Sequence, residues 1–357
     1  MKKLALQFVV GVALAAGLLW VVQDQLISDL EGGWQALWQA VLDLPAWAVV
    51  GYTASFIGVH VARVVRWVMQ VRPLGERDSR LVTRVCAIGY AAIVILPFRI
   101  GELVRPFLLA RESNKVSFSQ AMGTAVVERI FDGLFISLLL FIALATAPQV
   151  ASEWIRSAGF ISLMVFGGAS IGLALFVWQR EIAEKLVAAT FGLADLVQSK
   201  VTKRELGLSE KLVGLMNGFV YGVDALRRDG ALFWFVGLTF VYWGINAFGI
   251  WLLAVGFGIA LPWYAGAGLL AVLVVGIMLP AGPGLVGNFQ IALTAGLTLY
   301  LPDSEIGASA LAFTLVMNAI QLVIQVGFAV PFLRGMDLSP RDVIRAQEQA
   351  SATESAG

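Results

Sequence analysis

Residues 96–105 read Leu-Pro-Phe-Arg-Ile-Gly-Glu-Leu-Val-Arg, and they place several charged side chains in a strongly hydrophobic chain. A second charged group, Glu-Arg-Ile-Phe-Asp, follows at residues 128–132 in the next long apolar segment. In hydrocarbon an Arg or Asp at the middle of a helix costs roughly 2.5–3.5 kcal/mol, and pairing of opposite charges offsets part of that cost. Charges of this kind usually serve a function, so we expect the cluster to contact a substrate; the alternative is that it only fixes the fold. The candidate substrate-binding residues are Arg99, Glu102, Arg105, Glu128, Arg129 and Asp132.

The composition defines the class of protein. Of the 357 residues, 59% are hydrophobic and 14% are charged, whereas a soluble domain carries about 25% charged residues. Together with a mean hydropathy of +0.83, this predicts an all-α polytopic membrane protein: one membrane-embedded domain over residues 1–346 and a disordered tail over residues 347–357. The net charge of +1 does not indicate a nucleic-acid partner. Cys86 and His60 belong to no metal or catalytic motif, so we expect no metal, no cofactor and no enzymatic activity.

Apolar runs of about 20 residues predict about six spanning helices. Their approximate limits are Leu4–Val22, Pro45–Val65, Ser117 or Ser119 to Ala147, Ala158–Trp178, Leu232–Val255 and Ala308–Phe332. Residues 181–230 are amphipathic and are expected to form cytoplasmic helices on the membrane surface.

The distribution of basic residues predicts the orientation of these spans. Residues 23–44 contain four acids and no Lys or Arg, whereas a basic loop is expected after the second span. The arginines assigned to this loop are Arg63, Arg66, Arg72, Arg77, Arg80 and Arg84. Because cytoplasmic loops carry the excess of Lys and Arg, the N-terminus and the basic loop are predicted to be cytoplasmic, and the span count places the C-terminus there too.

Two apolar segments are interrupted, and each predicts a re-entrant helical hairpin. In the first, Val85–Leu96 is too short to span, Pro97 and Gly101 break it, and Glu102–Glu112 returns toward the cytoplasm. Non-helical backbone at membrane depth is tolerated only where it is buried in protein or lines a cavity, so this hairpin predicts a cavity.

The second interrupted segment is predicted to enter from outside. Trp263–Leu279 leads to a Pro/Gly-rich break, and Val286–Leu301 returns. The residues expected to shape the second break are Pro280, Gly282, Pro283 and Gly284. Polar residues that either line a secondary cavity or join helices by hydrogen bonds are Asn288, Gln290, Asn318 and Gln321.

The two breaks share the pattern Leu-Pro-x-x-x-Gly, followed closely by Leu-Val, and lie about half the chain apart. Broken apolar segments at corresponding positions in two halves are typical of inverted repeats with a binding site at their interface. Helix ends freed at such breaks suit an anionic group, and arginine can hold a phosphate in a bidentate fork. The residues alone therefore predict a transporter or flippase with a site that accepts an anion.

These motifs also resemble a known family. The segment Pro-x-Arg-x-Gly-Glu-x-x-Arg at residues 97–105, the segment Val-Glu-Arg-x-x-Asp at residues 127–132 and the Pro/Gly-rich run at residues 280–287 are similar to the flippase-like membrane domain of the lysylphosphatidylglycerol synthase family. The resemblance implies a stand-alone translocation domain in the cytoplasmic membrane of a bacterium or archaeon, without lipid aminoacylation. Where family members often carry a glutamate after the second run, this chain has Asn288 and Gln290.

The leading hypothesis is translocation of a polar-headed, phosphate-bearing lipid across the cytoplasmic membrane. Arginines of the cluster would hold the phosphate, and the acids would hold the arginines in place or meet a cationic head group. Three alternatives remain: a transporter of a small soluble anion, a membrane enzyme acting on lipid heads, and a scaffold for a lipid-modifying enzyme partner. The sequence leaves the lipid, the direction of movement, the energy coupling and a homo-oligomeric state open.

Overall fold

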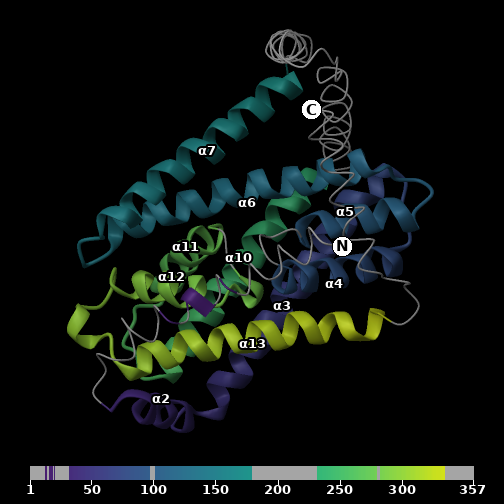
Figure 1. Ribbon diagram of the computed structural model, residues 1–357. Coiled ribbons are helices and arrows are strands. Elements are labelled where there is room, and N and C mark those ends of the chain that lie inside the picture. The colour runs from purple at the N-terminus through teal and green to yellow at the C-terminus, as the bar shows by residue number, and fades with distance from the viewer. Residues whose placement is uncertain are drawn as a thin grey trace.

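The computed structural model describes residues 32–96, 101–178, 231–279 and 282–333, with a few positions between 13 and 20. Within these ranges all regular structure is helical (Figure 1), so the prediction of an all-α protein is confirmed for the part of the chain described. Three predicted segments lie outside these ranges: almost all of Leu4–Val22, the amphipathic region 181–230 and the tail 347–357.

Five long helices and one short helix form the bulk of the described structure. They are α2 (Gly33–Leu42), α3 (Ala46–Val71), α6 (Phe118–Thr146), α7 (Glu153–Trp178), α10 (Ala231–Gly256) and α13 (Ala308–Leu333). Four segments are long and apolar enough to cross a membrane: Ala46–Leu74, Glu153–Gly172, Leu232–Gly256 and Ala308–Leu333. Large apolar side chains on α7, such as Met164 and Ile171, are exposed, as expected for a surface that faces lipid.

The first interrupted segment is an antiparallel pair of helices, α4 (Ser79–Ile95) and α5 (Gly101–Glu112). A β-carbon on Gly101 would collide with the backbone of Ala92, and one on Gly89 would lie 2.7 Å from the β-carbon of Arg105. The two arms therefore pack at backbone distance and run in opposite directions. The first arm begins six residues earlier than predicted because Asp78 caps it, accepting from the amides of Arg80 and Leu81.

The second interrupted segment has the same form. Helices α11 (Ala265–Ile277) and α12 (Asn288–Leu297) lie antiparallel, since a β-carbon on Gly276 would meet Ala292 and one on Gly296 would meet Leu269. The break contains a 3-10 turn, η5 (Pro283–Leu285), in which Gly284 has φ of +76°. That conformation suits glycine and makes Gly284 a requirement of the turn.

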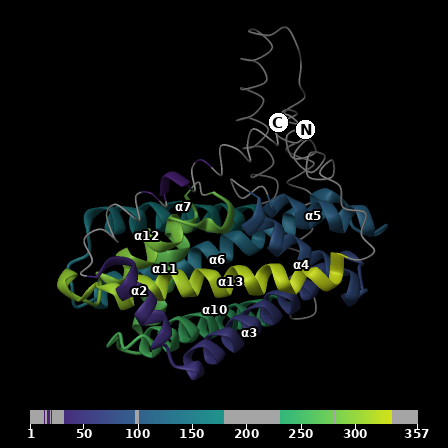
Figure 2. The ribbon, with the colours of Figure 1, turned by 60° about the horizontal axis from the view of Figure 1, so that its bottom comes forward.

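The two halves of the chain repeat one order of elements and one pattern of contacts. Each half has a long helix, a short helical hairpin and a second long helix: α3, α4–α5, α6 and then α10, α11–α12, α13. The first hairpin packs on α13 of the second half through α4, and the second hairpin packs on α6 of the first half through α11. Helices α3 and α10 pack along each other (Figure 2). This exchange of partners is what a two-fold relation between the halves would produce.

One prediction about the helices is wrong. The second span was expected to end at Val65 and to be followed by a basic loop, but α3 continues to Val71, so Arg63 and Arg66 lie within the helix. The prediction ended the span near the first arginine because it was based on the length of the apolar run. The helix continues because two acids of α6 compensate the charge of Arg66. Of the two caps predicted for α6, Ser117 and Ser119, the structure has Ser117, which forms a capping box with Gln120.

The core of the described residues has two large hydrophobic clusters, besides a small one of Val127 and Phe235. One contains the second hairpin with Ala62 of α3 and Ile136 of α6, and the other contains the first hairpin with Val64 of α3 and Ala121 of α6. The stretch of α6 between Ala121 and Ile136 carries its charged residues. The polar cluster therefore lies where the two large hydrophobic clusters meet.

We predict that Gly101→Ala destabilises the protein by about 1–3 kcal/mol, because the added methyl group overpacks the contact between the hairpin arms. Thermal unfolding in detergent measures the effect. Gly167→Ala on α7 is the matched control, since a β-carbon there meets nothing within 4 Å. Equal stability of the two variants would show that the arms do not approach so closely.

A second prediction concerns the base of the first hairpin, where buried Glu76 accepts from the amide of Asp78 and the hydroxyl of Ser113, each at 2.8 Å. These hydrogen bonds, and the amide of Asp78 most of all, hold the pKa of Glu76 below its ordinary value of 4.5. The stabilisation is fully present above pH 4.5 and is lost as the pH falls through the lowered pKa.

Glu76→Gln is therefore expected to cost about 1–3 kcal/mol at pH 7, and less as the pH falls below the ordinary carboxyl range. Unfolding temperatures of both proteins across a pH series measure this difference. The exposed Glu305→Gln is the control. A difference that grows on acidification would contradict the assignment.

Candidate functional site

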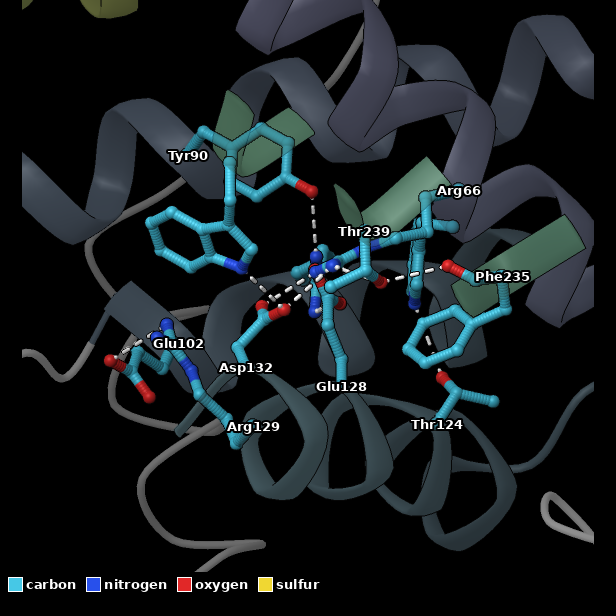
Figure 3. A network of polar contacts seen from close by, with 12 residues as sticks. Arg66, Tyr90, Glu102, Thr124, Glu128, Arg129, Asp132, Phe235 and Thr239 are labelled. Atoms are coloured by element: carbon cyan, nitrogen blue, oxygen red, sulfur yellow. Dashed lines mark hydrogen bonds and ion pairs between the residues drawn. The ribbon is translucent and has the colours of Figure 1, made fainter. Parts of the chain in front are cut away.

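Two acids of α6 and one arginine of α3 form the centre of the polar cluster. Glu128 and Asp132 are four residues apart and share one face of α6, which they direct toward Arg66 (Figure 3). Arg66 donates to both oxygens of Asp132 at 2.6 Å and to Oε1 of Glu128 at 2.7 Å. The Arg66 side chain is fully buried, and Thr239 accepts from it at 3.1 Å. The geometry is a bidentate ion pair removed from water.

The first hairpin joins this centre through Arg105. Its guanidinium donates to Oε2 of Glu128 at 2.6 Å and to the hydroxyl of Tyr90 at 2.8 Å. It also lies over the indole of Trp67, 4.7 Å from the ring centroid. Glu128 thus links α3, α6 and α5 through its two oxygens, and it holds the hairpin against the long helices.

A further ion pair connects α5 and α6 nearer the surface of the protein. Arg129 of α6 approaches Glu102 of α5 to 2.9 Å, and their side chains are 42% and 32% exposed. An exposed pair of this kind contributes about 0–1 kcal/mol, much less than breaking a buried one costs. The cluster therefore combines a fixed inner network with an outer pair that can be displaced.

Residues of the inner network and of the outer ion pair line one cavity of about 210 Å³. It lies between the first hairpin, α3, α6, α10 and the end of α11. Five of the predicted residues line it: Glu102, Arg105, Glu128, Arg129 and Asp132. Apolar residues complete the wall, and two of them, Val126 and Met278, are 38% and 42% exposed. The cavity thus has buried charges in its interior, and its exposed lining combines apolar side chains with the outer ion pair.

Sequence reasoning missed two members of this cluster, Arg63 and Arg66, which it assigned to a cytoplasmic loop. Arg63 lines the cavity with its guanidinium carbon 3.8 Å from the ring centroid of Tyr90. Their spacing of three residues, which places both on one face of a helix, was the available signal. This spacing indicates a site only once the residues that face these two arginines are known.

The polar residues of the second half serve mainly to join helices. Gln290 donates to Asn318 at 3.3 Å and accepts from the amide of Gly287, while Asn318 donates to the carbonyl of Gly284 at 3.2 Å. Gln321 donates to the hydroxyl of Tyr52 at 2.8 Å. Of the four polar residues predicted here, Asn288 lines a separate, largely apolar cavity of about 320 Å³.

Some predicted site residues lie outside the described ranges: Pro97, Arg99 and Pro280. Gly101 begins α5, whereas Gly282, Pro283 and Gly284 form the second break, whose turn contacts α4. In the part of the chain that the structure describes, no three His, Cys, Asp or Glu side chains gather to hold a metal ion.

The fold and the site define a helical membrane protein with two helical hairpins and a charged cavity beside the first. Residues 8–324 match the family described as the lysylphosphatidylglycerol synthase TM region, and the chain belongs to this family. The resemblance to this family that the sequence motifs indicated is confirmed.

The chain is also similar to a curated relative, Glycosyltransferase AglD of Haloferax volcanii, with 26% identity over 344 residues. The match covers 88% of this chain but 52% of the relative, so the chain spans about half of that protein's length. No solved structure matches the chain.

We predict that Arg66→Leu destabilises the protein by about 3–5 kcal/mol, because it removes both guanidinium contacts of Asp132 and one of the two donors of buried Glu128. Arg84→Leu is the control: its ion pair with Glu112, at 3.3 Å, lies outside the cavity and should be worth about 1 kcal/mol or less. Thermal or denaturant unfolding in detergent compares the two variants. Equal losses would contradict the structural role of Arg66.

Proposed function

We propose that this protein translocates a polar-headed, phosphate-bearing lipid across the cytoplasmic membrane. The observation that carries the proposal is the cavity, whose lining includes arginine side chains, and where apolar side chains are exposed beside the outer ion pair. A lipid has the same two parts: a charged head for the interior and acyl chains that remain in the bilayer. Membership of a family named after a lipid synthase's membrane region supports a lipid substrate.

The exposed apolar lining distinguishes a lipid from a small soluble anion. A soluble anion needs a wet path that is closed toward the bilayer, whereas Val126 and Met278 are exposed at the mouth of this cavity. Phe166 of α7 also lines it, and a β-carbon on Gly133 of α6 would collide with its ring. Apolar helices that would lie in the bilayer thus border the cavity.

The proposed topology places both hairpins within the membrane from opposite sides. It has six spans: the four apolar segments described above, α6, and the N-terminal run outside the described residues. The matching contact patterns of the two halves support an inverted repeat with the cavity near the hairpins. Both termini are then cytoplasmic, as the positions of the basic residues favour.

A scaffold for a lipid-modifying enzyme is the second candidate, and the glycosyltransferase name of the archaeal relative favours it. A scaffold needs the cluster for stability alone. The outer ion pair separates the two functions, because its removal should change transport with little effect on folding.

We expect the double variant Glu102→Gln, Arg129→Gln to slow translocation of fluorescently labelled phosphatidylglycerol at least about tenfold, as loss of a charge-assisted contact predicts. Its stability should change by about 1 kcal/mol or less. Chemical quenching of the label in proteoliposomes measures translocation. The matched control is Arg84→Gln, Glu112→Gln, which removes an ion pair between the hairpin arms outside the cavity. Wild-type protein that moves no lipid, or a site variant that moves it at the wild-type rate, would refute the proposal.

A further inference from the structure

The carboxylates of buried Glu128 and partly buried Asp132 are already fully engaged. Both oxygens of Glu128 accept from arginines, Oε1 from Arg66 and Oε2 from Arg105. Both oxygens of Asp132 accept from Arg66, and Oδ1 also accepts from the indole of Trp243 at 3.2 Å. A cationic head group would have to displace a guanidinium that is already held at 2.6–2.7 Å.

Arg63 is in the opposite situation. Its guanidinium carbon lies 3.8 Å from the ring centroid of Tyr90 and 5.9 Å from that of Tyr242. These cation–π contacts involve the face of the guanidinium. Its N–H groups point outward in its plane, so they remain available as hydrogen-bond donors. Within the described part of the chain, Arg63 forms no ion pair or hydrogen bond, and it lines the cavity.

The charges around the cavity are also unequal among the residues described. Three acids and three arginines line it: Glu102, Glu128 and Asp132 with Arg63, Arg105 and Arg129. Buried Arg66 does not line the cavity but pairs with two of these acids, so the cluster has one more arginine than acids. Arg63 is the arginine of this set that has no carboxylate within ion-pair distance, and Glu128 acts on it only at longer range. An excess positive charge in a partly dry cavity attracts an anion and repels a cation more strongly than it would in water.

We propose that Arg63 receives the phosphate of the substrate, and that the site selects lipid heads with a net negative charge over zwitterionic and cationic ones. This inference rests on the proposed function and specifies its substrate class. The planar guanidinium can bind two phosphate oxygens at once, and stacking on Tyr90 fixes its plane beforehand. The buried acids then position arginines and do not themselves meet a cationic head. A lysylated head is accordingly excluded as the preferred substrate.

The test measures binding to the purified full-length protein in detergent, so it does not depend on transport. Short-chain phosphatidylglycerol, phosphatidylcholine and lysylphosphatidylglycerol are the lipid ligands, and inorganic phosphate is the soluble one. We expect wild-type protein to bind phosphatidylglycerol at least about tenfold more tightly than the other two lipids. Arg63→Gln should weaken that binding about tenfold, and Arg63→Lys should lose less because it keeps the charge without the fork. Arg84→Gln should bind as wild type.

Two outcomes would overturn the inference: wild-type protein that binds the lysylated lipid as tightly as phosphatidylglycerol, or an Arg63→Gln variant with unchanged affinity and selectivity. If Arg63→Gln does not fold, the wild-type ranking and Arg63→Lys decide the question. Binding of phosphate that is lost in Arg63→Gln, without any binding of lipid, would support the anion role of Arg63 and refute lipid translocation. The two proposals can thus fail separately.

Discussion

The rest of the site depends on the two carboxylate oxygens of Glu128. One accepts from Arg66 of α3 and the other from Arg105 of the first hairpin, so a single buried side chain joins three elements. Burying charges in this way is a weak source of net stability, but removing one partner leaves the others uncompensated. The network therefore fixes where the hairpin lies relative to the long helices, and that placement creates the cavity.

The position of this network in the fold explains why it can be both buried and close to a cavity. The hydrophobic core is divided, with one hairpin in each of its two large clusters, and the charged residues lie between these clusters. An arginine inside a single continuous core would have no such neighbours. Here the charged side chains satisfy one another on one side and border open space on the other.

The two halves have the same architecture and different chemistry. Where the first hairpin is tied to α6 by Arg105 and Glu128, the second is tied to α13 by the amides of Gln290 and Asn318. The amide contacts place no net charge in the interior and leave nothing to attract an ionic head. Under the proposed function, the first half binds the polar part of the lipid, whereas the second half completes the wall.

The sequence by itself determined the helical membrane class, both hairpins, the start of α6 and most of the charged cluster. These follow from local information: apolar length, a proline or glycine break, a cap, and charges too costly to be accidental. Only the tertiary structure placed Arg63 and Arg66 in the site. Arg66 pairs with acids of α6 that are distant in the sequence, and Arg63 packs on the rings of Tyr90 and Tyr242. It also decided which acids are paired with arginines and which arginine of the cavity has no ion pair. The physical reason is that pairing is a property of distance in space, and the spacing of charges along one helix does not contain it.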